Sequence, residues 1–267
     1  MLSGGGAKPT LYGLVGVLVV FLVGPSLLMM ASSFSAGQVI SFPPQGFSLR
    51  WYASVFESRE LHLAAMHSAL VALVCTVTST VAGTLAAITL ARYRLYFRAG
   101  IEFYLLLPFV IPLTVEAVGL LDIFGVLRLL GRLWAVGIAI SAANLPFIIG
   151  AVTAAAKLLD PSLEEAAASC GARPIERFLT VTLPSLGPGI LAGALLMFIT
   201  GINEFVISAF LIDVRTMTLP VEIFDTGHGA PTPAIAAISV LYTLVSLGAV
   251  AMVDRLVGIQ FFLRSAR

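Results

Sequence analysis

Apolar and polar residues follow one another along this chain in long blocks, without the alternation of a strand or the narrow stripe of a surface helix. The apolar blocks contain few charges and reach about 20 residues or more, the length that an α-helix needs to cross a lipid bilayer. The pattern therefore predicts an all-α membrane protein with six transmembrane helices. The predicted spans are residues 11–34, 63–91, 101–124, 134–158, 185–212 and 233–262.

The polar intervals define the predicted domain organisation. One transmembrane domain covers residues 11–262, and short tails cover 1–10 and 263–267. For the first apolar block, a cleaved secretory signal is the alternative, because small residues follow it. Its apolar run is about twice as long as the core of a signal peptide, so we expect an uncleaved span.

Composition supports the membrane class. Apolar residues make up 59% of the chain and charged residues only 11%, whereas about 25% of the residues in an ordinary soluble domain are charged. The lipid bilayer is therefore the expected surrounding of this protein. A formal net charge of +1 supplies no basic surface, so we expect no nucleic acid partner.

The basic residues indicate an orientation. An even number of spans places both termini on one side, together with residues 92–100 and 160–184. Cytoplasmic loops are enriched in Lys and Arg, so we expect this side, with both termini, to be cytoplasmic. It carries nine basic residues, Lys8, Arg92, Arg94, Arg98, Lys157, Arg173, Arg177, Arg264 and Arg267, against five on the other side, Arg50, Arg59, Arg128, Arg132 and Arg215.

No motif indicates catalysis or a bound nucleotide. The glycine-rich segment before Lys8 has alanine where a phosphate-binding loop has glycine, and no strand precedes it. If ATP drives this protein, another chain must bind it. The histidines and cysteines lack metal-ligand spacing, and we expect no catalytic residue, no metal and no cofactor. They are His62, His67, His228, Cys75 and Cys170.

The longest polar interval in the second half of the chain, residues 160–184, has the pattern of two short helices. It opens with residues that start a helix, continues to a glycine that ends one, and restarts at a proline with an amphipathic pattern at 174–181. These residues are Asp160, Pro161, Gly171 and Pro174, and the apolar face is Ile175, Phe178 and Leu179. A capped surface hairpin without a specific role is the alternative. We expect the hairpin to close at Leu183–Pro184, and residues 187–189, Gly-Pro-Gly, to break the span that follows.

This interval resembles the cytoplasmic loop of ABC importer permease subunits. That family's pattern is Glu-Ala-Ala, three residues, Gly, nine residues, an aliphatic residue, one residue and Leu-Pro. The matching residues here are Glu165, Ala166, Ala167, Gly171, Val181, Leu183 and Pro184. The resemblance implies the type I importer permease fold, with residues 174–181 as a cytoplasmic coupling helix. It also implies an ATPase-coupling site made of Glu165, Ala166, Ala167, Gly171, Ile175, Phe178, Leu183 and Pro184.

Acidic residues inside the predicted spans are candidates for a solute path, since a charge in lipid is expensive. Glu116 and Glu204 lie in the outer halves of the third and fifth spans, roughly 24 and 27 Å from the inner ends at 1.5 Å per residue. Thr200 and Ser208 flank Glu204 at a spacing of four residues, with Asn203 beside it, which predicts a polar helix face. We expect a path that admits positive charge. Hydrogen bonding between helices is the alternative.

Several further segments are similar to spermidine/putrescine-type permeases. The matching segments are Pro108 and Pro112, 144–147 (Asn-Leu-Pro-Phe), 203–205 (Asn-Glu-Phe) and 218–220 (Thr-Leu-Pro). Many members of that group have an acidic residue directly after the third-span proline. This chain has Leu113 there, and its nearest acidic residue is Glu116.

The resemblance implies a non-enzymatic permease subunit of the bacterial inner membrane, which moves a small organic solute, in particular a cationic, polyamine-like compound. The implied partners are two copies of a cytoplasmic ATP-binding subunit, a second and homologous permease chain, and a periplasmic or extracellular solute-binding protein. A second copy of this chain is the alternative for the permease partner. A secondary transporter or channel subunit not coupled to an ATPase is the alternative function, but it would not need the loop motif.

Overall fold

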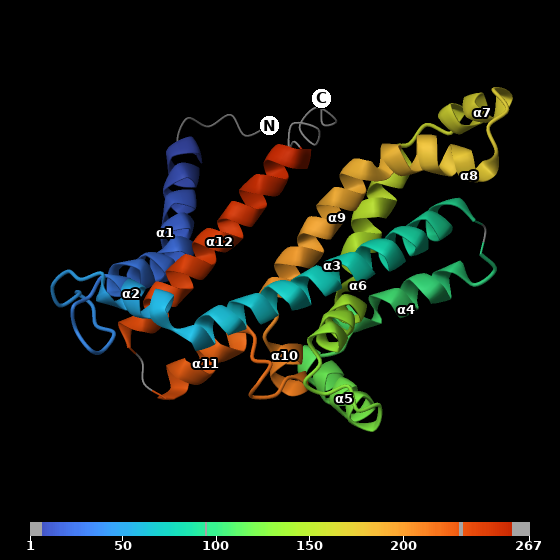
Figure 1. Ribbon diagram of the computed structural model, residues 1–267. Helices are drawn as coiled ribbons and strands as arrows, with labels where there is room; N and C mark the ends of the chain where they lie inside the picture. The colour runs from blue at the N-terminus through green and yellow to red at the C-terminus, as the bar shows by residue number, and fades with distance from the viewer. Residues whose placement is uncertain (1–6, 94, 230–231, 258–267) are drawn as a thin grey trace. The chain divides into compact units, whose positions relative to one another are not determined.

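The computed structural model describes residues 7–93, 95–229 and 232–257. Residues 1–6 and 263–267 of the predicted tails, and the predicted end of the last span at 258–262, lie outside the described residues. The described part of the chain is helical and contains no strand (Figure 1). Its helices are α1 (Ala7–Ser33), α2 (Arg50–Glu57), α3 (Arg59–Arg92), α4 (Arg98–Val110), α5 (Leu113–Val126), α6 (Leu133–Leu158), α7 (Ser162–Ser169), α8 (Pro174–Arg177), the π-helical segment η1 (Phe178–Thr182), α9 (Leu183–Asn203), α10 (Val206–Leu211), α11 (Leu219–Gly229) and α12 (Pro233–Val257).

Among the described residues, four helices are long and apolar enough to cross a membrane: Leu11–Ser33, Arg59–Arg92, Leu133–Leu158 and Pro174–Asn203. Helices α4 and α5 pass the same test together as a bent pair, and α12 contributes the shorter apolar segment Pro233–Gly248. An apolar helix or helix pair therefore lies at the position of each predicted span. The number of crossings stays a prediction.

Contacts within the chain divide it into two compact units, which we describe separately. One contains Met1–His62 and Ile223–Val245, and the other contains Leu63–Glu222 and Ser246–Arg267. In the first unit, aromatic side chains fold the loop after α1 onto the end of that helix. Tyr52 and Ser33 share a hydrogen bond of 2.7 Å between their hydroxyls, and the Phe34 ring stacks on Phe47 with centroids 5.4 Å apart.

In the second unit, α6 and α9 run side by side (Figure 1), and α6 contributes the largest share of the core. Glycines on α9 allow this close approach. A Cβ added at Gly189 would lie 2.5 Å from the Cβ of Ala155, and one at Gly193 would lie 2.7 Å from Cγ1 of Ile148. Small residues at such contacts are typical of helix packing in lipid. The largest fully buried side chains of this pair are Val136, Ile140, Ile148, Val152, Leu186 and Met197.

Two predicted spans contain a break. The third changes direction by 101° between α4 and α5. The break lies at Ile111–Pro112, because Pro112 has no N–H with which to continue the α4 hydrogen bonds. The fifth ends as a helix at Asn203 and restarts as α10 at Val206.

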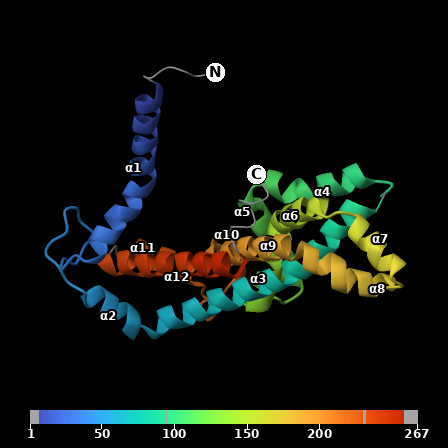
Figure 2. The same cartoon turned by 90° about the horizontal axis from the view of Figure 1, so that it is seen from above.

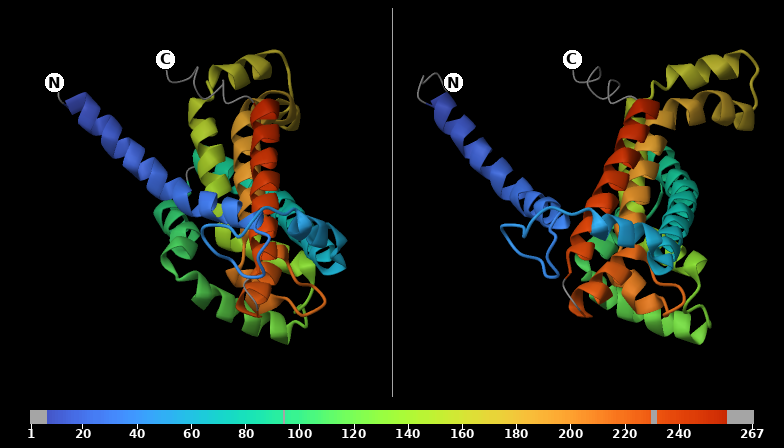
Figure 3. Two further views of the ribbon diagram at one scale, coloured as in Figure 1. Left: turned by 90° about the vertical axis from the view of Figure 1, so that its left-hand side faces the viewer. Right: turned by 60° about the vertical axis from the view of Figure 1, so that its left-hand side comes forward.

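No break occurs at residues 187–189, where we expected one, whereas η1 ends at Thr182 and α9 begins at Leu183, where we expected the hairpin to close. Helix α9 continues through Pro188, which neighbouring groups in a packed membrane helix tolerate. The chain changes direction instead at η1, where α8 turns away from α9 (Figure 3). A π-helical segment is one of the recognised causes of a helix kink.

Candidate functional site

The hairpin at residues 160–184 lies between the end of α6 and the start of α9 (Figure 2). Its first helix begins as the sequence predicts. Asp160 accepts a hydrogen bond through Oδ1 from the backbone N–H of Ser162, at 2.9 Å, and so satisfies one of the free N–H groups at the start of α7. This hydrogen bond holds the pKa of Asp160 below its ordinary value.

Gly171 ends α7, also as predicted. Its φ is +86°, in the left-handed region that glycine adopts without strain. The N–H groups of Gly171 and Ala172 donate to the carbonyls of Ala168 and Ala167, at 2.9 and 3.1 Å. This is the Schellman arrangement of a helix C-terminus. It reverses the chain within a few residues, which brings α8 back beside α7 (Figure 2).

The apolar face of the second helix divides into two parts. Ile175 and Leu179 are 74% and 53% exposed, and they lie one helical turn apart. Phe178, which we grouped with them, is half-buried and packs against the core of the unit. The exposed apolar surface of α8 and η1 is therefore narrower than the sequence pattern predicts.

The remaining predicted coupling residues lie along the same hairpin. Glu165 and Ala166 on α7 are exposed, and Ala167 is half-buried. Leu183 is half-buried and Pro184 is exposed in the first turn of α9. No contact with an ATPase tests these residues, so their role stays a prediction.

A polar contact that the sequence analysis did not predict joins the hairpin to α3. Glu164 on α7 accepts a hydrogen bond from Arg92 at the end of α3, with 2.9 Å between Nη1 and Oε2. The same carboxylate accepts a hydrogen bond from the hydroxyl of Thr182 in η1, which is buried. Both helical segments of the hairpin and the distant end of α3 therefore meet at one carboxylate.

The ionisation of Glu164 follows from these partners. Burial raises the pKa of this carboxyl, but the hydrogen bonds from Thr182 and Arg92 and the positive charges of Arg92 and Arg177 outweigh burial. The pKa of Glu164 therefore lies below its ordinary value, and the group is charged at neutral pH. Arg92, directly after the second predicted span, was the only sign of this contact in the sequence. No sequence pattern pairs Arg92 with Glu164.

Glu204 lies between α9 and α10 and is only 7% exposed. Its Oε1 accepts the backbone N–H of Ile207 and its Oε2 accepts that of Ser208, both at 2.9 Å. Glu204 therefore satisfies the free N–H groups at the start of α10. The expected continuous polar face of Thr200, Glu204 and Ser208 does not form, because the helix is interrupted at Glu204.

The neighbours of Glu204 are bonded locally. Thr200 and Asn203 donate to the carbonyls of Leu196 and Ile199, at 2.8 and 2.7 Å. Asn203 is exposed, and Ser208 is fully buried.

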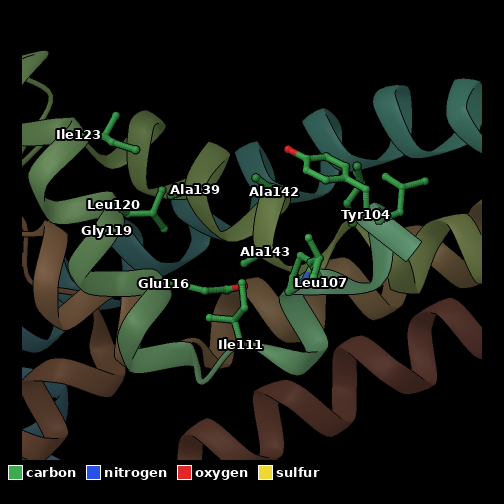
Figure 4. Close-up of a pocket in the computed structure, with 13 residues that line it drawn as sticks. Tyr104, Leu107, Ile111, Glu116, Gly119, Leu120, Ile123, Ala139, Ala142 and Ala143 are labelled. Carbon is green, nitrogen blue, oxygen red and sulfur yellow. The ribbon is translucent and has the colours of Figure 1, made fainter. Parts of the chain in front are cut away.

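Glu116 lies elsewhere, in the first turn of α5. It lines a pocket of about 500 Å³ between α4, α5 and α6 (Figure 4). The other lining residues are mostly apolar and include Tyr104, Leu107, Ile111, Leu120 and Ala142. Glu204 is absent from the described residues that line this pocket, so the structure does not bring the two acids together in it.

Comparisons with known proteins agree on one family. A family model described as "Binding-protein-dependent transport system inner membrane component" matches residues 79–259. The spermidine/putrescine transport system permease protein PotC of Haemophilus influenzae is 28% identical over 236 residues, which cover 88% of this chain and 91% of the relative. The putrescine transport system permease protein PotI of Escherichia coli is 29% identical over 243 residues, which cover 87% of this chain and 84% of PotI.

Solved structures show the same fold. A chain of a bacterial alginate ABC transporter, in complex with an alginate pentasaccharide-bound periplasmic protein, gives a TM-score of 0.74 at 15% identity. The match covers 93% of this chain and 92% of that one. A chain from another structure, of a bacterial ABC transporter involved in alginate import, gives a TM-score of 0.69 at 17% identity. That match covers 93% of this chain and 95% of the other.

Proposed function

The chain belongs to the family of binding-protein-dependent transport system inner membrane components, and on this premise we propose its coupling site, its assembly and its solute. It is a permease subunit of an ABC importer and a multi-pass protein of the inner membrane. It is a transport component and not an enzyme, and the ATPase is a separate partner. A second permease and a periplasmic binding protein complete such an importer.

The proposed coupling site is the hairpin at residues 160–184. The exposed pair Ile175 and Leu179 carries this proposal, because two large apolar side chains on a surface helix call for a partner surface. A cleft of the ATPase that receives one short helix would cover them. Glu165, Ala166 and Gly171 of the loop motif lie on the same hairpin and would face the same partner. The proposed assembly has two ATPase copies and one homologous permease chain.

The proposed solute is a small organic cation of the polyamine type. The named substrates of PotC and PotI are polyamines, and the acidic residues of the predicted third and fifth spans, Glu116 and Glu204, favour a cation. The fold does not select the solute, since the structurally similar alginate importer takes an acidic polysaccharide. Thr200, Asn203 and Ser208 belong to the same proposed path.

The coupling proposal is tested by Ile175→Ala combined with Leu179→Ala. In the complete importer in proteoliposomes, we expect ATP-driven putrescine uptake to fall at least about fivefold, since each truncation removes apolar area that the ATPase would bury. The amount of permease in the membrane should not change. Uptake and ATPase binding are measured per assembled complex.

Val214→Ala is the matched control, because Val214 is an aliphatic residue that is 85% exposed outside the hairpin. Normal uptake and normal ATPase binding by the double variant would contradict the coupling site. Putrescine uptake that persists without any ATPase would instead support a secondary transporter or channel.

A further inference from the structure

We propose that the pocket between α4, α5 and α6 binds the ammonium end of an aliphatic cation, with Glu116 as its counter-ion. This inference rests on the proposed function, because it assigns one part of the solute path to a defined site. It gives Glu116 and Glu204 different roles, although the sequence analysis made both of them candidates for the solute path.

The first argument is the state of the Glu116 carboxylate. Its Oε2 atom is buried and has no hydrogen-bond partner among the described residues. The side chain points into the pocket, between Ile111 and Ala143 (Figure 4). A buried carboxylate oxygen without a partner is costly, and an ammonium group would supply both a hydrogen bond and the opposite charge.

The second argument is the C-terminal end of α4. Pro112 has no N–H, so the carbonyl of Pro108 lacks the donor that would follow four residues later in a continuous helix. Pro108 and Leu107 line the pocket. Carbonyl groups at a helix C-terminus carry partial negative charge and favour a cation. The break between α4 and α5 therefore adds to the attraction of Glu116.

The third argument is the rest of the lining. Leu120, Ile123, Ala139 and Ala142 give apolar walls, which suit the methylene chain of an aliphatic amine better than the hydroxyls of a sugar. Tyr104 adds an aromatic ring, whose face attracts cations. The volume of about 500 Å³ lies within the range of known small-molecule sites.

Glu204 has a different role by the same reasoning. Both of its carboxylate oxygens already accept backbone N–H groups of α10. Helix α10 packs against α5, which carries Glu116. Glu204 therefore acts as a positioning residue that holds the start of α10, and the carboxylate that meets the cation is Glu116.

The test uses the full chain in membrane vesicles, with Cys75 and Cys170 replaced and Ala142→Cys as a reporter in the pocket. Two methanethiosulfonate reagents of similar size, one cationic and one anionic, modify the new thiol. We expect the cationic reagent to react faster. Glu116→Gln should lower the ratio of the two rates about 25-fold, because a unit charge in contact across water changes the rate of each reagent about fivefold, in opposite directions. Putrescine and butylammonium should slow the modification, whereas butanol and butyrate should not.

Asp122→Asn is the matched control. It removes the same charge from the same helix, but Asp122 is exposed and is not among the described residues that line the pocket. This variant should keep both the charge preference and the protection. Gly119→Cys is a second reporter if Ala142→Cys does not insert, since Gly119 lines the pocket and a Cβ there meets no atom within 4 Å.

Modification without charge preference and without protection by putrescine would overturn the site. Protection that persists in Glu116→Gln would overturn the role of Glu116. Because the labelling requires neither ATP nor a partner chain, its result is independent of the uptake assay. Failure of ATP-driven putrescine uptake with intact protection in the pocket would count against the proposed function alone.

Discussion

At the scale of single residues, Glu164 has the most informative surroundings in the hairpin. It joins α7 to Arg92 on α3 and to Thr182 in η1. Its pKa is lowered in the folded hairpin, so the contact stabilises the hairpin above the ordinary glutamate pKa of about 4.3. That stabilisation is lost only as the pH falls through the lowered value. The contact is therefore fully formed at neutral pH.

Reversing the charges of this contact tests its role. We expect Arg92→Glu to lower uptake per assembled complex about two- to fivefold, because an exposed ion pair contributes about 0.2–1 kcal/mol and like charges repel by a similar amount. Combining Arg92→Glu with Glu164→Arg should restore most of the loss. The measurement is uptake normalised to assembled importer.

The control is a second ion pair. Arg98 and Glu102 form a pair of 2.9 Å within the single helix α4, and both are exposed. Because this pair lies within one helix, it does not connect separate segments. The substitution Arg98→Glu should therefore change uptake little. If the charge reversal at Arg92 and Glu164 rescues nothing, the contact does not transmit coupling.

At the scale of elements, the sequence predicted what is decided locally. Asp160 and Gly171 mark the ends of α7 because cap residues and left-handed turns depend on a few neighbouring atoms. The sequence did not predict that Phe178 lies apart from Ile175 and Leu179. The π-helical turn of η1 contains an extra residue, and the Phe178 side chain packs against the core instead of joining the exposed apolar surface. A π-helical insertion has no compositional signature comparable to a cap or a proline.

The breaks in the helices also depend partly on local sequence and partly on packing. Pro112 and Pro188 are both prolines inside predicted spans, yet only the first ends a helix. The difference arises from packing, since α9 lies closely against α6 around Pro188. The break at Glu204 depends on its carboxylate bonding to α10, which no pattern of apolar positions reveals.

The close contact between α6 and α9 gives a matched pair of substitutions. Gly189→Ala should destabilise the protein by about 1–3 kcal/mol, because the added methyl group would overlap Ala155. Gly187→Ala lies on the same helix, and its added Cβ meets no atom within 4 Å. This second variant should keep the melting temperature of the parent protein in detergent.

Melting temperatures of the two variants, measured under identical conditions, decide the point. Equal temperatures for Gly187→Ala and Gly189→Ala would mean that α6 and α9 are farther apart in the membrane than in the structure.

At the scale of the whole molecule, composition was sufficient to predict a membrane protein, because a chain with so few charges cannot cover a soluble surface. The length of the apolar blocks then predicted that its spans are α-helices. The loop motif then indicated the family. Which helices pack together did not follow from either, since every span offers apolar side chains in all directions.

The proposed orientation is testable on intact cells with an impermeant thiol reagent. In a background without the native cysteines, Val39→Cys and Val214→Cys should be labelled from outside, because residues 35–62 and 213–232 are the predicted outer loops. Tyr96→Cys should react only after the membrane is permeabilised. All three parent side chains are exposed.

Cys170 supplies an internal check, since it is exposed on the hairpin, whereas Cys75 is buried. In the protein that retains only Cys170, labelling should also require permeabilisation. Labelling of Cys170 or Tyr96→Cys on intact cells, without labelling of Val214→Cys, would reverse the orientation.

The glycine contacts between α6 and α9 have a mechanical consequence. The hairpin at residues 160–184 joins the ends of these two helices, and Gly189 and Gly193 leave no space for one to slide along the other. A push on the hairpin therefore displaces both helices together, as one stiff lever. The interruptions at Ile111–Pro112 and at Glu204 would then be the places where the chain bends, close to Glu116 in the proposed cation site and to the positioning residue Glu204. If the hairpin is the coupling site, the place where force enters is therefore separate from the places where the chain bends.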